Sequence, residues 1–174
     1  MIIIKLISKF IKVLSSAASP NQIAWGFALG TIPGLTPINA LHNAVVLILL
    51  IILNVNISSA LFALLIYSLF AWMLDPFFHA IGYYVLAEIP ALTSFWTSLY
   101  NAPIAPLTRF NNTVVMGSFL VAIALLIPHY LLFKWFVRKY RDTWNEKIKK
   151  WKITKAITGS KVVKLYLKFK DVGE

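Results

Sequence analysis

The sequence predicts an all-α integral membrane protein. Of its 174 residues, 59% are hydrophobic and only 13% are charged, and the mean hydropathy is +0.75. These values lie outside the usual balance of a soluble globular domain. The charges are also segregated, because no Asp, Glu, Lys or Arg occurs between residues 13 and 74. Lysine and arginine gather at the two ends, so both termini are expected to be cytoplasmic and the number of crossings even.

Residues 1–14 are predicted to form an interfacial amphipathic helix. Lys5, Lys9 and Lys12 recur at helical spacing among Ile, Leu, Phe and Val, a pattern typical of helices that lie on a membrane. The net charge of +11 favours anionic phospholipid over nucleic acid as a partner, because basic residues beside membrane segments contact anionic head groups. The chain has no cysteine, which excludes disulfides and thiolate metal sites.

A membrane domain is predicted over residues 15–136. Residues 57–74 and 114–133 are apolar and, as helices, approach the ~30 Å hydrocarbon thickness. Between them we expect a short helix at 76–90 and an external loop at 91–112. That loop is rich in Thr, Ser, Asn and Pro, with aromatic residues suited to a membrane interface.

Residues 20–53 are predicted to form a re-entrant helical hairpin, because the apolar pieces at 23–35 and 40–53 are short for full spans. A rival arrangement lets every short piece cross obliquely, giving four or more spans. Small residues one turn apart let another helix approach closely, and prolines are expected to end the first helix at the turn. These packing and hairpin residues are Gly26, Gly30, Gly34, Pro33 and Pro37. Broken helices of this kind either build polar transport sites or serve packing alone.

Four polar residues are candidates for contacts with a lipid head group: Asp75, His79, Arg109 and His42. Asp75 stands alone in an apolar stretch, and an ionisable residue in a membrane segment is a functional hypothesis. Asp75 before Pro76 is also a favourable N-cap, with His79 one turn along, so both interpretations stay open. No nucleophile, phosphate loop, paired carboxylates or metal-ligand spacing is present, so we expect no enzyme, cofactor or metal.

Residues 137–174 are predicted to leave the membrane as a basic cytoplasmic region. An apolar stripe at helical spacing indicates an amphipathic helix and comprises Val137, Tyr140, Trp144, Ile148 and Trp151. Residues 162–169 alternate with period two, which predicts a strand with one face formed by Val163, Leu165, Leu167 and Phe169. A single strand needs another sheet edge. This segment is therefore either a partner-binding strand or a disordered basic tail.

A longer motif is carried by Ser19-Pro20, Ile23-Ala24, Gly26-Phe27-Ala28-Leu29-Gly30, Gly34 and Pro37. It resembles the signature of a bacterial membrane family known as domain of unknown function 2062. Asp75-Pro76 before Tyr83-Tyr84 resembles the family's Asn-Pro feature, and the likeness covers about residues 15–90. Ala40 and His42-Asn43 depart from the family's Gly and Gln-Thr, and Asp75 from its Asn, which argues that the carboxylate charge is not essential.

The family carries no assigned activity. The likeness to its small members with a basic C-terminal extension implies a larger envelope partner, which we expect to be a β-rich lipid-transfer protein. We therefore expect a non-enzymatic inner-membrane subunit of an envelope lipid-transport or lipid-handling complex. An autonomous carrier or scramblase of a phosphorylated lipid is one alternative, and a structural membrane anchor is another. A homo-oligomer is also left open.

Overall fold

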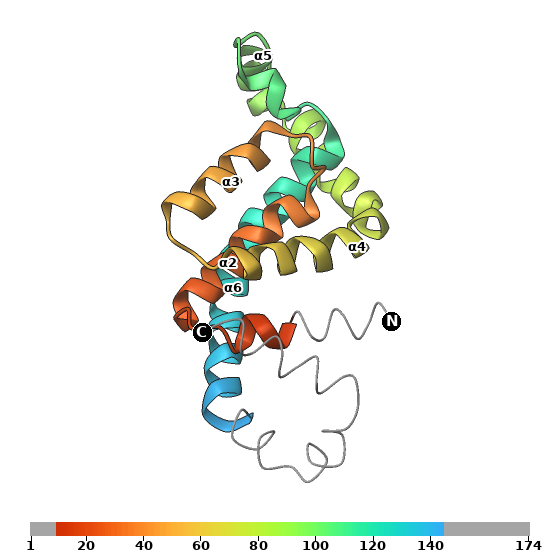
Figure 1. Ribbon diagram of the computed structural model, residues 1–174. Helices are drawn as coiled ribbons and strands as arrows, with labels where there is room; N and C mark the ends of the chain where they lie inside the picture. Colours follow the sequence, from red (N-terminus) through yellow and green to blue (C-terminus); the bar gives the residue numbers. More distant parts are fainter. Residues whose placement is uncertain (1–9, 145–174) are drawn as a thin grey trace.

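A computed structural model describes residues 10–144 (Figure 1). Helices and the turns between them account for this part of the chain, which contains no strand. The all-α prediction is therefore confirmed for these residues. Of the predicted helix at 1–14, only residues 10–14 are described, and they are helical. The predicted strand at 162–169 lies outside the described residues, as does most of the predicted basic region 137–174.

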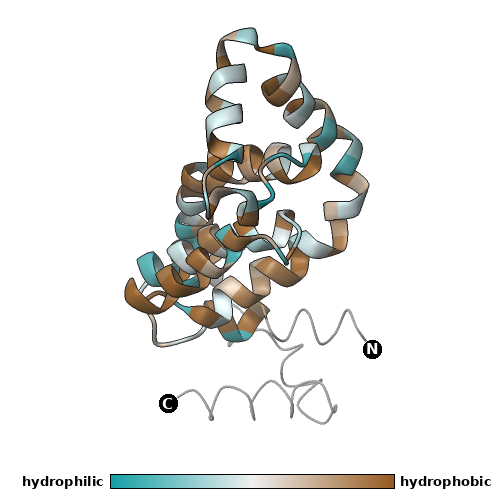
Figure 2. Ribbon diagram, turned by 90° about the horizontal axis from the view of Figure 1, so that it is seen from above, coloured by the Kyte–Doolittle hydropathy of each residue, from teal (hydrophilic) through white to brown (hydrophobic). Residues whose placement is uncertain are grey.

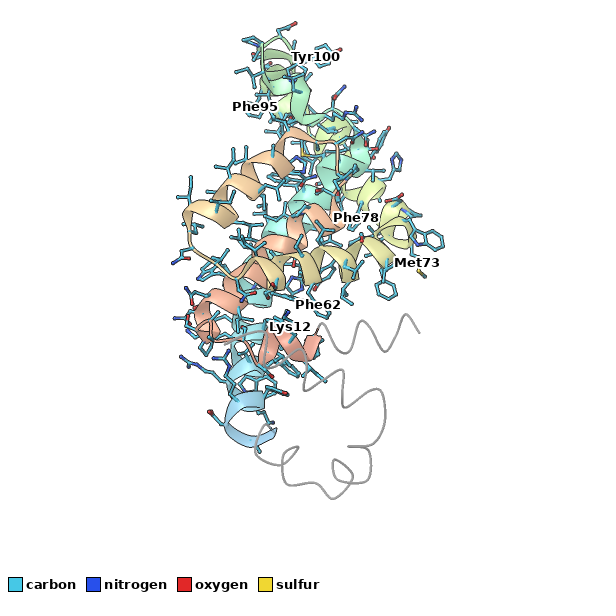
Figure 3. All side chains as sticks on the ribbon, in the orientation of Figure 1. Lys12, Phe62, Met73, Phe78, Phe95 and Tyr100 are labelled. Carbon is cyan, nitrogen blue, oxygen red and sulfur yellow. The ribbon has the colours of Figure 1, made fainter. Side chains whose placement is uncertain are left out.

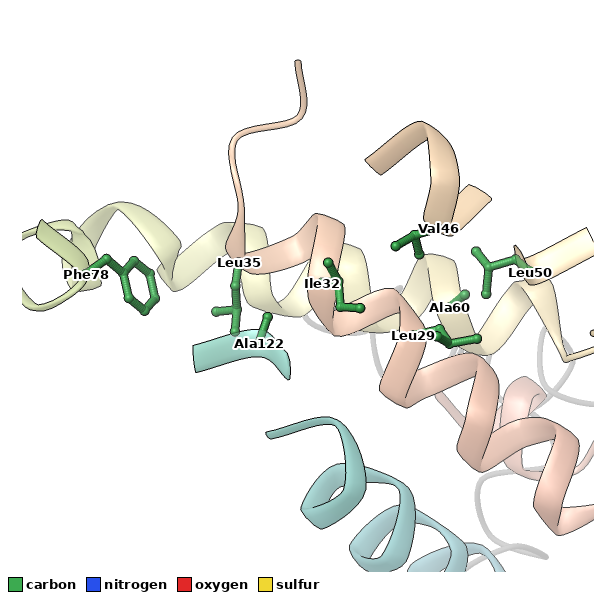
Figure 4. Close-up of a cluster of buried hydrophobic side chains, with 8 residues drawn as sticks. All are labelled: Leu29, Ile32, Leu35, Val46, Leu50, Ala60, Phe78 and Ala122. Carbon is green, nitrogen blue, oxygen red and sulfur yellow. The ribbon is translucent and has the colours of Figure 1, made fainter. Parts of the chain in front are cut away.

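Three helices pack together at the centre of the molecule: α2 (Pro20–Leu35), α4 (Ile57–Tyr83) and α6 (Thr113–Lys139). α2 is the innermost, because 11 of its 16 residues are buried. A helix that is apolar on all sides needs cover on all sides, and α4 and α6 supply much of it. The shared core runs from one end of α2 to α3 (Figure 4) and comprises Leu29, Ile32, Leu35, Val46, Leu50, Ala60, Phe78 and Ala122.

α3 (Leu41–Ile52) lies at the edge of this bundle, and only three of its 12 residues are buried. Two of them, Val46 and Leu50, point toward α2 and α4 (Figure 4). α2 has far more of its surface against α4 and α6 than against α3. The two helices predicted to form a hairpin, α2 and α3, are therefore consecutive in the chain, but α2 packs mainly against α4 and α6.

The helix predicted to end at residue 74 does not end there. α4 continues through Asp75 and Pro76 to Tyr83 and then widens into the π-helix η1 (Tyr84–Glu88). The prediction of a separate helix at 76–90 capped by Asp75 is therefore wrong. A proline inside a helix removes one backbone donor, and that loss is offset here by packing of the following turns, since Phe78 and Gly82 are buried against α6.

The segment predicted as an external loop at 91–112 also contains helical turns. They project from one end of the bundle (Figure 1). The Trp96 indole N–H donates to the Val85 carbonyl at 3.1 Å, and its ring stacks on Phe110 with centroids 5.8 Å apart. These contacts fold the segment back on η1. Its elements are η2 (Pro90–Leu92), α5 (Thr93–Tyr100) and η3 (Ala105–Thr108).

α6 is longer than the predicted 114–133 and continues into the π-helix η4 (Tyr140–Trp144) without a break at residue 136. Two continuous helical segments, Ile57–Glu88 with 32 residues and Thr113–Thr143 with 31, are long and apolar enough to cross a membrane. Only 22% and 28% of their most apolar stretches are buried. Hydrophobic residues accordingly line all the helices rather than one side (Figure 2).

Candidate functional site

The glycines of α2 lie against α4. A Cβ atom on Gly26 would overlap the backbone carbonyl of Asn56, and one on Gly30 would overlap the backbone of Ala60. A Cβ atom on Gly34 would lie 2.8 Å from the Cβ of Tyr67. Gly26 and Gly30 therefore need glycine because the two backbones approach too closely for a side chain, whereas Gly34 leaves room for the Tyr67 side chain.

A second close approach, between α4 and α6, was missed from the sequence. A Cβ atom on Gly82 would overlap the backbone carbonyl of Thr113, and one on Gly117 would overlap that of Phe78. Each of these glycines stands alone in its apolar segment. A single small residue carries no periodic signal, so only the fold reveals that the two glycines face the same contact.

A chain of polar side chains crosses the centre of the bundle and joins its three helices. His129 of α6 lies between Thr31 of α2 and Tyr67 of α4. Its Nδ1 is 3.3 Å from the Thr31 Oγ1, and its Nε2 is 2.9 Å from the Tyr67 hydroxyl. Phe27 lies edge-on to the imidazole with ring centroids 6.2 Å apart. An aromatic ring thus lies directly beside this polar chain.

The donors and acceptors among these polar side chains can be assigned by starting from Thr31. The Thr31 hydroxyl has one hydrogen, which it donates to the Phe27 carbonyl at 3.1 Å. Nδ1 of His129 must then carry the ring hydrogen to bond Thr31, which leaves Nε2 of the neutral ring to accept from Tyr67. Every member is satisfied in this arrangement. Buried polar groups that are fully paired fix one arrangement of the elements they join.

His129, Tyr67 and Thr31 were not singled out from the sequence. His129 is the one histidine within the predicted segment 114–133. An ionisable residue in an apolar segment is a candidate functional residue, as Asp75 was. Thr31 and Tyr67 carry no comparable signal, because hydroxyl side chains are common in apolar helices. Their partner becomes visible only once α2, α4 and α6 are in contact.

The turn between α2 and α3 is held by a buried amide. Asn43, which is 3% exposed, places its Oδ1 2.9 Å from the Thr36 Oγ1 and donates from Nδ2 to the Pro37 carbonyl at 2.9 Å. Pro37 therefore lies in the turn as predicted, whereas Pro33 lies within α2, which continues to Leu35. The prediction that Pro33 ends the helix is wrong, because α2 ends only at Leu35 and the Thr36 N–H caps the Ile32 carbonyl there.

The four predicted head-group residues do not share contacts. Asp75 is exposed on α4 and makes no ion pair with any residue from 10 to 144. His79, expected within reach of Asp75, instead has its Nδ1 2.7 Å from the Thr113 Oγ1. Arg109 is exposed in a left-handed turn with φ of 59°. The described residues contain no group of three side chains suited to a metal ion.

His42 is the fourth of these residues and lies at the start of α3. Its ring is 4.8 Å from that of Phe119 in α6, centroid to centroid. Its Nε2 is buried and has no hydrogen-bond partner among the described residues. The structure therefore places the His42 ring against Phe119 of α6.

An arginine joins the two ends of the described chain. Arg141 donates from Nε to the Leu14 carbonyl at 3.1 Å and from Nη2 to the carbonyls of Ser16 and Ala18 at 2.7 and 2.9 Å. The carbonyls at a helix C-terminus have no partner within the helix. Arg141 supplies one, and so fixes the end of the N-terminal helix against α6. Sequence patterning offered no sign of this contact.

Over residues 10–144 the fold is all-helical, with two helices long and apolar enough to cross a membrane. The sequence model of a family described as "Uncharacterized protein conserved in bacteria (DUF2062)" matches residues 5–145. The chain belongs to this family. The resemblance seen over residues 15–90 is thereby confirmed and extends over most of the chain.

Among known proteins, the chain is similar to an uncharacterized protein of Treponema pallidum (strain Nichols). The two are 23% identical over 145 residues, which make up 83% of this chain and 89% of the relative. No solved structure matches the chain.

Proposed function

We propose that the protein is a multi-pass protein of the bacterial inner membrane and a non-enzymatic subunit of an envelope lipid-handling complex. The observation that carries the membrane part is the apolar exterior. Large side chains point outward along the long helices, among them Met73, which is 59% exposed (Figure 3). Burying such surfaces in lipid avoids the cost of apolar contact with water, about 25 cal/mol per Å². Others of this kind are Leu69, Phe70, Trp72, Phe77, Ile127, Leu131 and Leu132.

A re-entrant hairpin over residues 20–53 is part of this proposal. α3 has 12 residues, and at the helical rise this gives about 18 Å, short of the hydrocarbon core. Gln22 at the start of α2 donates from Nε2 to the Asn54 carbonyl at 3.1 Å and accepts from the Asn56 N–H at 3.1 Å. The segment thus begins and ends at the same place, which favours entry and exit on one side.

The same end carries the remaining support for the proposed topology. The N-terminal helix, the start of α2 and the end of α6 meet there through Arg141, and the lysine-rich ends of the sequence continue from it. By the positive-inside rule this end is cytoplasmic. The basic ends would attract anionic phospholipid, and the predicted strand 162–169 would dock the larger β-rich partner.

An autonomous carrier of a phosphorylated lipid is the second candidate function. One observation favours it over a structural anchor: the Thr31–His129–Tyr67 chain places three polar side chains inside the bundle, where a polar group is costly unless it is used. The carrier would act without a partner, whereas the subunit would not.

Purification from bacterial membranes in mild detergent tests these proposals. We expect the protein to resist carbonate extraction and to co-purify with a larger β-rich protein and with phospholipid, as identified by mass spectrometry. Lipid movement by the protein alone in liposomes would support the carrier function and contradict the subunit function. A bound partner without phospholipid would indicate an anchor, and release by carbonate would overturn the membrane proposal altogether.

A further inference from the structure

Where α2 begins and α6 leaves the bundle, one lysine is held in a fixed position. The Nζ of Lys134 lies 3.1 Å from the hydroxyl of Tyr130, one turn earlier on α6, and 5.2 Å from the centre of its ring. Tyr130 stacks on Trp25 of α2 with ring centroids 4.4 Å apart. Its hydroxyl also donates to the Asn21 Oδ1 at 3.3 Å. The ammonium is thereby positioned by two helices.

This cluster presents hydrogen-bond donors that the protein does not use. Tyr130 gives its hydrogen to Asn21, so its oxygen accepts one of the three hydrogens of Lys134, which leaves two. The Trp25 indole N–H makes no hydrogen bond with any residue in 10–144. No carboxylate in that range is paired with Lys134. The fixed positive charge is therefore available to an anion.

The position of the cluster indicates which anion it would meet. Lys134 directly follows the apolar segment 114–133, and Trp and Tyr side chains prefer the level of the head groups. Asn21 lies in the first turn of α2, where the helix dipole adds positive potential. An anion at this depth in the proposed membrane orientation is the phosphate of a phospholipid.

We propose that Lys134, Trp25 and Asn21 bind the phosphate group of an anionic phospholipid, with Tyr130 as the residue that positions the lysine. This site rests on the proposed membrane function. It lies on α2 and α6 and uses none of the residues predicted from the sequence to contact a head group. The lipid tails would lie along the exposed apolar surface of α6, on which Ile127 is 51% exposed.

The test is the retention of phosphatidylglycerol against phosphatidylcholine by the full-length protein, measured by native mass spectrometry from mixed-lipid nanodiscs. Lys134→Gln should lower phosphatidylglycerol retention about fivefold, the effect of one basic residue near an anionic surface. Tyr130→Phe keeps the ring and the charge but removes the hydroxyl, so we expect a loss of about twofold. Phosphatidylcholine retention should fall less, because its choline ammonium offsets the negative charge of its phosphate.

Lys139→Gln is the matched control. Lys139 also lies over an aromatic ring, that of Trp135 at 4.7 Å, but no contact with α2 positions it among the described residues. Removal of its charge should leave phosphatidylglycerol retention within about 1.5-fold of the wild type if position matters more than net charge. An equal loss in both lysine variants, or equal retention of the two lipids by the wild type, would overturn the site.

Two further measurements distinguish failure of the lipid site from a loss of protein stability and from failure of the proposed complex. Lys134→Arg preserves charge and reach, and its retention of phosphatidylglycerol should exceed that of Lys134→Gln even if both variants are less stable; equal loss would contradict the site. Co-purification of the β-rich partner is scored in the same preparations. Lysine-dependent lipid retention without a partner would support the site while contradicting the proposed complex.

Discussion

At the scale of single residues, the imidazole of His129 links the three central helices of the bundle. Both of its ring nitrogens are engaged, by Thr31 at 3.3 Å and by Tyr67 at 2.9 Å. The neutral ring has one donor and one acceptor, and its two neighbours match them. Loss of either neighbour leaves a polar atom of the partly buried ring unpaired, which costs more than the hydrogen bond alone contributes.

The first prediction is a coupling between Tyr67 and His129. Tyr67→Phe should lower the free energy of unfolding by about 1 kcal/mol, because Nε2 of His129 loses its donor. In a His129→Leu background the same substitution should cost little, since no acceptor remains. The double-mutant cycle is measured by thermal unfolding in detergent, with Tyr100→Phe at an exposed position as control. Equal costs of Tyr67→Phe in both backgrounds would contradict the hydrogen bond.

At the scale of helices, the bundle is organised by close backbone contacts. Gly30 meets the backbone of α4, whereas the nearest atom to a Cβ on Gly34 belongs to the side chain of Tyr67. Backbone cannot move aside without shifting a whole helix, so the two glycines differ in what their replacement would displace. This difference leads to a graded expectation.

Gly30→Ala should destabilise the protein by roughly 2 kcal/mol, because overpacking against the α4 backbone exceeds the helix propensity gained by alanine. Gly34→Ala should cost less, since the contact lies 2.8 Å away at a side-chain atom. The thermal unfolding midpoints of the two variants in detergent measure this difference in stability. A midpoint for Gly30→Ala at or above that of Gly34→Ala would show that the helices separate more easily than the contacts imply.

Helices were predictable from the sequence where their signals repeat. Three glycines one turn apart predicted that another helix lies close to α2, although not that this helix is α4, and long apolar stretches predicted the greater part of α4 and α6. The prediction that a new helix begins at Asp75-Pro76 was wrong, because it used only a local capping signal. The contacts of the next turn are distant in sequence: Phe78 and Gly82 lie one turn apart on the face of α4 that meets α6. Continuity of α4 was therefore decided by a partner 30 or more residues away.

The candidate site was less predictable than the fold. The four residues chosen for their charge or rarity lie apart, whereas the central chain and the Lys134 cluster each join side chains of α2 to side chains of α6. Such pairs are about 100 residues apart in sequence and leave no local pattern. Recognition of Tyr130 or Tyr67 required the helices to be placed against each other.

At the scale of the whole molecule, the proposed topology separates the two ends. Ala17 precedes α2, Asn39 lies in the turn between α2 and α3, and Asn101 follows α5; all three are exposed. α5 projects from the end of the bundle opposite to the start of α2 (Figure 1). The chain has no cysteine, so single-cysteine variants report one position each. Labelling with an impermeant maleimide can therefore assign each end to a side of the membrane.

In intact spheroplasts, Asn101→Cys should react and Ala17→Cys should not, because basic termini favour a cytoplasmic location. Asn39→Cys, in the exposed turn between α2 and α3, separates the hairpin from the rival arrangement with four or more spans. A re-entrant hairpin keeps this position unreactive in intact spheroplasts. Reaction of Asn39→Cys from outside would show that the apolar pieces at 23–35 and 40–53 each cross the membrane.

The burial of α2 also bears on the order in which the chain is assembled. The helix that needs the most cover is made first, and much of its cover comes from α4 and α6, the latter ending at Lys139. At a synthesis rate of about 5–20 residues per second, α2 waits several seconds for α6 to emerge from the ribosome. During that interval its glycine face and Thr31 lack their final neighbours. A nascent chain stalled before residue 113 is therefore the form of this protein that a membrane chaperone or protease would meet.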